Sequence, residues 1–180
     1  MLHSFAEKLE FGKQAEIAVS DWLKRRGWYV VPSYDYNGDD NKAPRLAGLF
    51  STFVVPDLDV SKDGTRLWVE VKRYCDSPVN RKLGERVHGI KERLYKEYLM
   101  VQRVSGTPAY LMVVEDFEGG SVLCQRLDTM EPHACQCGSC RSGQPYHCRA
   151  PIKASVYFRR SEFIECGTTA ELVGGLEGAA

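Results

Sequence analysis

Two short stretches near the middle of the chain alternate apolar and polar residues, at 54–60 and 68–72. Alternation with a period of two is typical of half-buried β-strands. The residues between them, 62–65, include the Asp-Gly pair of a tight turn. The pattern therefore predicts a β-hairpin in this part of the chain.

The polar positions of this hairpin carry candidate chemistry. Successive side chains of a strand point to opposite faces. Asp57 and Asp59 therefore share one face of the first strand, and Glu70 and Lys72 share one face of the second. Two carboxylates can hold a hard cation such as Mg²⁺, which prefers oxygen ligands. A neighbouring lysine can orient or deprotonate a water, or neutralise a developing anion. Together these groups suffice for metal-assisted hydrolysis of a phosphodiester.

Hydrophobic spacing and turn residues predict the rest of the fold. Ser4 and Glu7 form a capping box before an apolar periodic stretch, and Gly27 ends that helix. An almost wholly apolar run at 109–114 is typical of a buried central strand. The other expected elements are a helix over 4–26, a strand over 28–31, a loop over 33–52, a helix over 85–104, an antiparallel edge strand over 121–127, a strand over 154–159 and a frayed tail from 167 to 180.

Pro56-Asp57 followed by Glu70-Val71-Lys72 resembles the signature of the PD-(D/E)XK nucleases. The resemblance covers roughly residues 5 to 116 and implies an α/β fold, the restriction-endonuclease-like core, in which helices flank a mixed central sheet. The order of helix, Gly27, Trp28 and strand resembles the opening of archaeal Holliday-junction resolvases and related small nucleases.

The resemblance assigns a role to each motif residue. It implies that Asp57 and Glu70 hold one or two Mg²⁺ or Mn²⁺ ions, helped by the Val71 carbonyl and by Glu16 on the first helix. Lys72 would position or deprotonate the attacking water, and the products would carry 5′-phosphate and 3′-hydroxyl ends. Asp59 is then a spare carboxylate, because the family places one acidic residue after the proline.

Charge is distributed locally, because 24 Lys and Arg balance 24 Asp and Glu over the whole chain. Residues 72–103 contain nine Lys and Arg and four Asp and Glu, an excess of five positive charges. Such a segment can contact phosphates, although a solvated helix face with ion pairs has the same composition. The candidate nucleic-acid contacts are Arg73, Arg81, Lys82, Lys91 and Tyr95.

Four of the seven cysteines fall within fourteen residues, in a segment with almost no aliphatic side chain. A closed tetrahedral metal site can replace a hydrophobic core in such a segment. The sequence therefore predicts a structural Zn²⁺ site, with an iron–sulfur cluster or a disulfide pair as alternatives. The six candidate ligands are Cys135, Cys137, Cys140, Cys148, His133 and His147.

Taken together, the sequence predicts a nuclease-like domain over 1–128 and 150–166, a zinc-binding insertion over 129–149 and a tail over 167–180. The expected function is metal-dependent hydrolysis of DNA, structure-selective or end-processing, of the type found in phages and mobile elements. Resolvase-like enzymes of the family act as dimers, so a homodimer is also expected. No apolar run is long enough for a membrane span and the first residues lack a signal-peptide pattern, so a cytoplasmic location is expected. The alternative is a non-catalytic nucleic-acid-binding or zinc-dependent interaction protein that retains the fold.

Overall fold

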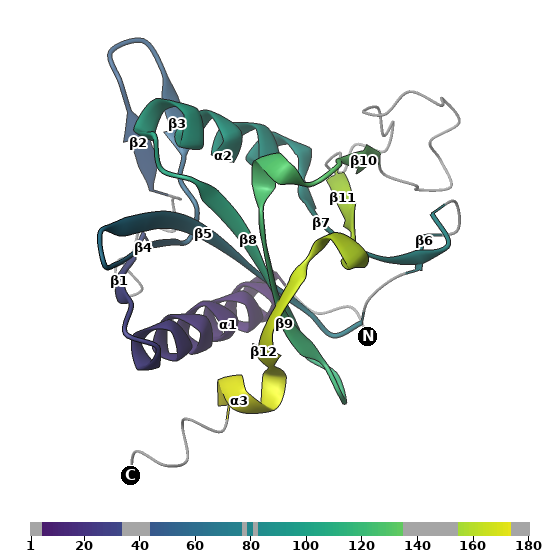
Figure 1. The fold of residues 1–180 in the computed structure, drawn as a ribbon. Coiled ribbons are helices and arrows are strands. Elements are labelled where there is room, and N and C mark those ends of the chain that lie inside the picture. The colour runs from purple at the N-terminus through teal and green to yellow at the C-terminus, as the bar shows by residue number, and fades with distance from the viewer. Residues whose placement is uncertain (1–4, 34–43, 77–78, 81–82, 135–154, 174–180) are drawn as a thin grey trace.

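A computed structural model of the 180-residue chain describes residues 5–33, 44–76, 79–80, 83–134 and 155–173. Its centre is a six-stranded sheet of order β1-β4-β5-β8-β9-β12 (Figure 1). The strands β5 and β8 run parallel, and every other neighbouring pair in this sheet is antiparallel. The bounds are β1 Tyr29–Pro32, β4 Leu58–Lys62, β5 Thr65–Tyr74, β8 Ala109–Glu115, β9 Ser121–Arg126 and β12 Ile164–Thr168.

Two helices cover opposite faces of this sheet, α1 (Phe5–Arg25) on one side and α2 (Glu92–Ser105) on the other (Figure 1). Each of the central strands β5 and β8 contributes side chains to both faces. Consecutive residues along a strand point to opposite faces, so they pack against different helices. Val69, Val71 and Met112 belong to the core cluster formed with α1. Leu111 and Val113 belong to the cluster formed with α2. The predicted mixed central sheet flanked by helices is therefore confirmed.

A second sheet, of order β10-β11-β7-β6, packs against the α2 side. Its strands are β6 (Val79–Asn80), β7 (Glu85–Lys91), β10 (His133–Ala134) and β11 (Ser155–Arg159). A separate two-stranded hairpin, β2 (Arg45–Ala47) and β3 (Thr52–Val54), projects from the body beside α2 (Figure 1). The short 3₁₀ turns η1 (Leu127–Thr129) and η2 (Arg160–Glu162) and the helix α3 (Thr169–Val173) complete the described elements.

The helix predicted over 85–104 is wrong in its first part, since residues 85–91 form strand β7 and the helix begins at Glu92. Val87, His88, Gly89 and Ile90 are all buried, so β7 lacks the alternation by which a half-exposed strand is recognised. Ile90 also continues the helical spacing of Leu94 and Tyr98. Lys91, the residue before the helix, makes no capping hydrogen bond with its side chain, so the sequence holds no start signal.

Three further expectations require correction. The region 33–52 is not simply a loop, since β2 and the start of β3 lie within it, although 34–43 lie outside the described residues. Strand β9 is antiparallel as predicted but is not an edge, because β12 pairs along its other side. The expected frayed tail begins too early, since 167–168 end β12 and 169–173 form α3, where Leu172 is buried. Residues 174–180 lie outside the described residues.

None of the helices in the described part of the chain combines the length and apolar character that crossing a membrane requires.

Candidate active site

The motif residues meet where β4 and β5 lie side by side. The two strands pair antiparallel with Leu58 opposite Val69, so Asp57, directly before β4, lies next to Glu70 on β5. The turn between the strands uses left-handed backbone at Asp63 (φ 49°) and Gly64 (φ 78°), as a tight hairpin requires. The hairpin predicted from the sequence therefore forms and brings two carboxylates together.

Hydrogen bonds fix the three charged side chains relative to one another. The backbone N–H of Val71 donates to Asp57 Oδ2 at 2.8 Å. Lys72 Nζ donates to Glu70 Oε1 and, at 2.9 Å, to the Val71 carbonyl, and it lies 4.0 Å from Asp57 Oδ2. Asp57 and Glu70 are buried, whereas 32% of the Lys72 side chain is exposed. The ammonium thus closes the solvent side of a buried carboxylate pair.

The site has more negative than positive charge, because two carboxylates, Asp57 and Glu70, lie beside one ammonium, Lys72. Burial raises the pKa of Asp57 well above its ordinary value, and the charges of Glu70 and Glu16 raise it further, while Lys72 and the Val71 N–H act in the opposite direction. Burial would lower the pKa of Lys72, but the charges of Glu70 and Asp57 outweigh it, so the net shift is upward. One ammonium does not compensate the negative charge, and a further cation would lower the cost of keeping both carboxylates ionised.

Glu70 Oε2 is buried and has no hydrogen-bond partner among the described residues. A buried carboxylate oxygen without a partner is costly unless a ligand or ion satisfies it. Mg²⁺ is often held by only one or two carboxylates, with waters and substrate phosphates completing its octahedral shell. The oxygen donors of Asp57 and Glu70 therefore fit a hard divalent cation.

Glu16 lies on α1, half-buried, and its charge is among those that raise the Asp57 pKa. Helix α1 packs along β5, where Ala15 and Val19 share a core cluster with Val69 and Val71. Within the described residues, however, no group of three or more His, Cys, Asp or Glu side chains is arranged to hold a metal. Glu16 is thus an electrostatic neighbour of the carboxylate pair in this structure.

Asp59 lies apart from the site. Its carboxylate accepts hydrogen bonds from Arg66 Nε at 2.9 Å and Arg66 Nη2 at 2.6 Å, across the β4–β5 pair. It therefore has a partner of its own on the hairpin.

The residues expected to contact phosphates have varied surroundings. Arg73 donates to Asp116 at 2.8 and 3.1 Å and lies over the Phe11 ring, so contact with a phosphate would require it to leave these partners. Tyr95 is half-buried against Phe158. Lys91 is exposed at the end of β7. Arg81 and Lys82 lie outside the described residues.

Of the six candidate zinc ligands, only His133 lies within the described residues. It is on β10, opposite Tyr157 of β11, and its Nε2 lies 3.3 Å from Arg159 Nε. Cys135, Cys137, Cys140, Cys148 and His147 lie outside the described residues, so the zinc site stays a prediction.

Sequence reasoning missed Tyr74, which lies two residues after Lys72 and so on the same face of β5. Its hydroxyl donates to the Gly89 carbonyl and accepts from the Gly89 N–H at 3.1 Å, which ties β5 to β7. Burial raises its pKa, and the charges of Lys72 and Glu70 also act on it. The strand alternation that gave Glu70 and Lys72 would have pointed to Tyr74 as well.

Comparison with known proteins places the fold. No protein-family model matches the sequence, and no curated protein matches it. Among solved structures, the chain is similar to Hjc, a Holliday junction resolvase from the archaeal hyperthermophile Archaeoglobus fulgidus. The TM-score is 0.51 and the identity 15%, over 86% of this chain and 95% of that one. It is also similar to D212, a nuclease from a fusselovirus, with a TM-score of 0.39 and 14% identity over 99% and 95% of the two chains.

The likeness to Hjc confirms the restriction-endonuclease-like fold that the motif predicts.

Proposed function

We propose that this chain is a metal-dependent nuclease that hydrolyses phosphodiester bonds in DNA. The observation that carries the proposal is the buried pair Asp57 and Glu70, with Lys72 beside it and Glu70 Oε2 left without a hydrogen-bond partner. The support from the fold is its similarity to a Holliday junction resolvase.

In this proposal the carboxylates bind the metal and Lys72 acts on the water and the phosphate. Asp57, oriented by the Val71 N–H, and Glu70 would hold Mg²⁺ or Mn²⁺, with the Val71 carbonyl and Glu16 as further candidate oxygen donors. When bound, such a cation polarises the scissile phosphate and makes a water more acidic. Lys72 holds its Nζ beside both carboxylates, and their charges raise its pKa and keep it an ammonium. In that form it can orient the water or neutralise charge on the phosphate.

We further propose a structure-selective or end-processing activity on branched, single-stranded or duplex DNA, of the kind found in phages and mobile elements. The support for this proposal is the likeness of the fold to a Holliday junction resolvase. Phosphate contacts would then come from Lys91, Arg81 and Lys82, and the protein would work as a homodimer. The cysteine-rich segment would hold structural Zn²⁺.

The test is cleavage of labelled linear, forked and four-way-junction DNA with Mg²⁺ or Mn²⁺. Lys72→Ala should reduce cleavage at least about 100-fold, because it removes a charge that acts on the transition state. Lys62→Ala is the matched control, since Lys62 is on the neighbouring strand and donates to the Arg26 carbonyl at 2.8 Å, away from the carboxylate pair. It should cut like the wild type.

Two results would contradict the proposal. One is Lys72→Ala cutting as fast as the wild type. The other is a folded wild type that binds DNA but cuts none of the substrates with either metal, which would indicate a nucleic-acid-binding protein that retains the fold. The preferred substrate of an active enzyme would identify its class.

A further inference from the structure

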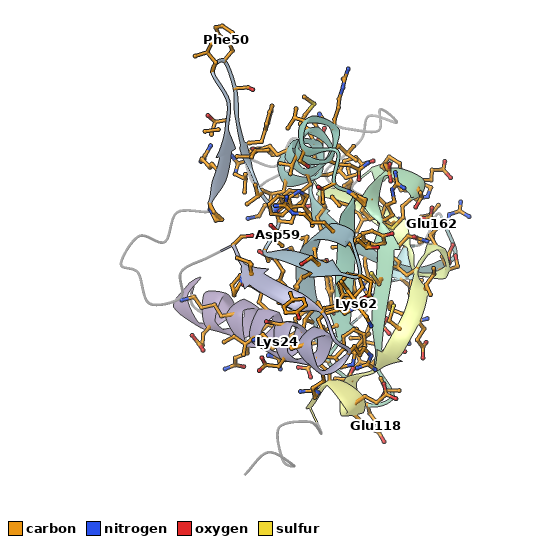
Figure 2. The ribbon with its side chains drawn as sticks, turned by 60° about the vertical axis from the view of Figure 1, so that its left-hand side comes forward. Lys24, Phe50, Asp59, Lys62, Glu118 and Glu162 are labelled. Atoms are coloured by element: carbon orange, nitrogen blue, oxygen red, sulfur yellow. The ribbon has the colours of Figure 1, made fainter. Side chains whose placement is uncertain are left out.

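The β2–β3 hairpin exposes two large apolar side chains at its tip. Gly48 N–H donates to the Ser51 carbonyl at 2.8 Å and closes a turn whose outer residues are Leu49 and Phe50. These side chains are 89% and 94% exposed, more than any other large hydrophobic residue in the described part of the chain. Figure 2 shows Phe50 at the far end of the hairpin, away from the sheet.

The base of the same hairpin is firmly held. The N–H of Val54 donates to Glu97 Oε2 of α2 at 2.6 Å, and the N–H of Val55 donates to the Pro44 carbonyl at 3.2 Å. Leu46 and Phe53 pack against the core cluster on the α2 side. The hairpin is therefore an arm with an anchored base and an apolar tip directed into solvent.

The fold does not require apolar residues at the tip of this hairpin, Leu49 and Phe50. Turns usually carry Gly, Asn, Asp or Ser, because these residues suit turn backbone and water. Leu49 and Phe50 gain nothing from burial in this chain, and neighbouring exposed apolar side chains often mark a binding surface. From residue 44 to residue 56 the chain has no acidic residue and one basic residue, Arg45, which is exposed. An apolar, non-acidic tip is compatible with a polyanion that offers flat apolar faces, as nucleic-acid bases do.

The hairpin leads directly into the candidate active site. Six residues lie between Phe50 and Asp57. Their Cα atoms are therefore at most about 25 Å apart, even if the chain is fully extended. Base steps in duplex DNA are about 3.4 Å apart, so the tip can act no more than about seven steps from a bond held at Asp57.

We propose that the β2–β3 tip is a base wedge. Phe50 stacks on an unpaired base or enters a base step, with Leu49 beside it, within a few steps of the bond to be cut. Apolar side chains that enter base steps unstack and kink the duplex, and this costs least where bases are already unpaired. The wedge would thus favour forks, junctions and frayed ends over intact duplex. The inference rests on the proposed nuclease function, which it extends to substrate selection.

The test uses forked and four-way-junction DNA with 2-aminopurine beside the branch point, bound by full-length protein with EDTA present so that nothing is cut. The fluorescence of 2-aminopurine rises when the base is unstacked. Wild type should raise it, and Phe50→Ala should abolish the rise and weaken binding about tenfold. Phe50→Trp should preserve both, because tryptophan also stacks. Tyr29→Ala is the matched control, since Tyr29 is a 78% exposed aromatic residue on β1, and it should behave like the wild type.

The outcomes separate the wedge from the nuclease. If the enzyme cuts DNA in Mg²⁺ but Phe50→Ala binds, unstacks and cuts as the wild type does, the wedge is wrong and the nuclease stands. If the protein unstacks DNA through Phe50 but never cuts it, the wedge stands and the nuclease is wrong. A wild-type dimer that Phe50→Ala converts to a monomer in sedimentation would assign the tip to a second copy of the chain and overturn the wedge. Equal thermal melting of all variants excludes misfolding as the cause.

Discussion

Asp57 is buried beside a second carboxylate, and burial together with the charge of Glu70 raises its pKa. Asn at this position would still accept the Val71 N–H hydrogen bond while removing one of two crowded negative charges. We expect Asp57→Asn to melt at the wild-type temperature or a few degrees higher without metal, since about 1 kcal/mol corresponds to roughly 2–4 °C in a domain of this size. Cleavage should fall at least about 100-fold, because a cation ligand is lost.

Asp59→Asn is the control for this change. Asp59 pairs with Arg66, whose side chain is 56% exposed, and surface pairs of this kind contribute little to stability. The Asp59 variant should keep full cleavage, and thermal melting with a gel assay measures both properties. If Mg²⁺ raises the melting temperature of wild type but not of Asp57→Asn, the carboxylate also binds the metal. Normal cutting by Asp57→Asn would contradict its role.

Strand β7 approaches β11 so closely that its glycine has no room for a side chain. A Cβ on Gly89 would lie 2.5 Å from the Val156 carbonyl oxygen and 2.7 Å from Tyr157 Cδ1. We expect Gly89→Ala to lower the free energy of unfolding by about 1–3 kcal/mol, as overpacking does. Chemical denaturation monitored by circular dichroism would measure the change.

Gly12 provides the comparison. It lies inside α1, and a Cβ there would meet nothing within 4 Å. Because glycine is a poor helix former, Gly12→Ala should raise the unfolding free energy by about 0.5–1 kcal/mol. Equal effects of the two substitutions would mean that the β7–β11 contact is looser than the structure has it.

A buried ionic cluster joins the two sheets. His88 of β7 lies with its Nε2 at 2.9 Å from Glu115 Oε1 of β8, and Arg160 of η2 donates to both Glu115 oxygens at 2.8 Å. Burial lowers the pKa of His88 below 6.5, and Arg160 and Arg86 act in the same direction, against the effect of Glu115. Burial would raise the pKa of Glu115, but its hydrogen bonds to Arg160 and His88 lower it below 4.5.

These shifts predict how stability depends on pH. As pH falls below 6.5, the unfolded chain binds a proton at His88 and the folded chain does not, so stability decreases. Glu115 adds a second loss below 4.5, because its folded form holds its proton less tightly. The raised pKa of Asp57 acts in the opposite direction, so the histidine is isolated by comparing wild type with His88→Gln. From about pH 7.5 to 5.5, the unfolding free energy of wild type relative to this variant should decline by at most about 1.4 kcal/mol per pH unit. Identical slopes in the two proteins would contradict the assignment.

At the scale of elements, the sequence was most informative where its pattern was strong. The first helix, the motif strands and β8 follow from capping residues, alternation and an apolar run. The β2–β3 hairpin was missed because its turn, Gly48 to Ser51, lacks the Asn-Gly or Asp-Gly signal. Strand β12 was missed because four of its five residues are exposed, so no apolar pattern marks it.

At the scale of the whole molecule, the sequence did not predict contacts between segments that lie far apart in the chain. The motif predicted which residues meet, but not that Glu70 Oε2 would lack a partner or that Arg73 would bond to Asp116, because both depend on contacts between segments far apart in the chain. The second sheet likewise depends on β7, whose sequence continues the helical spacing of α2.

The cysteine-rich segment enters and leaves the fold at one place. Ala134 of β10 lies opposite Val156 of β11, so the positions flanking residues 135–154 are already held together by strand pairing. A segment joined in this way can be shortened without separating the strands. Replacing its 20 residues by a four-residue glycine–asparagine turn should lower the entropic cost of closing this connection by about 1.4 kcal/mol, because each halving of a loop contributes roughly 0.6 kcal/mol.

We therefore expect the shortened protein to fold, to melt within a few degrees of wild type and to retain cleavage of DNA. Elemental analysis should find zinc in the full chain and none in the shortened one. Iron with brown colour in the full chain would instead indicate the iron–sulfur alternative. A shortened protein that fails to fold would contradict the prediction, because it would make the segment part of the core and its metal a requirement for the nuclease fold.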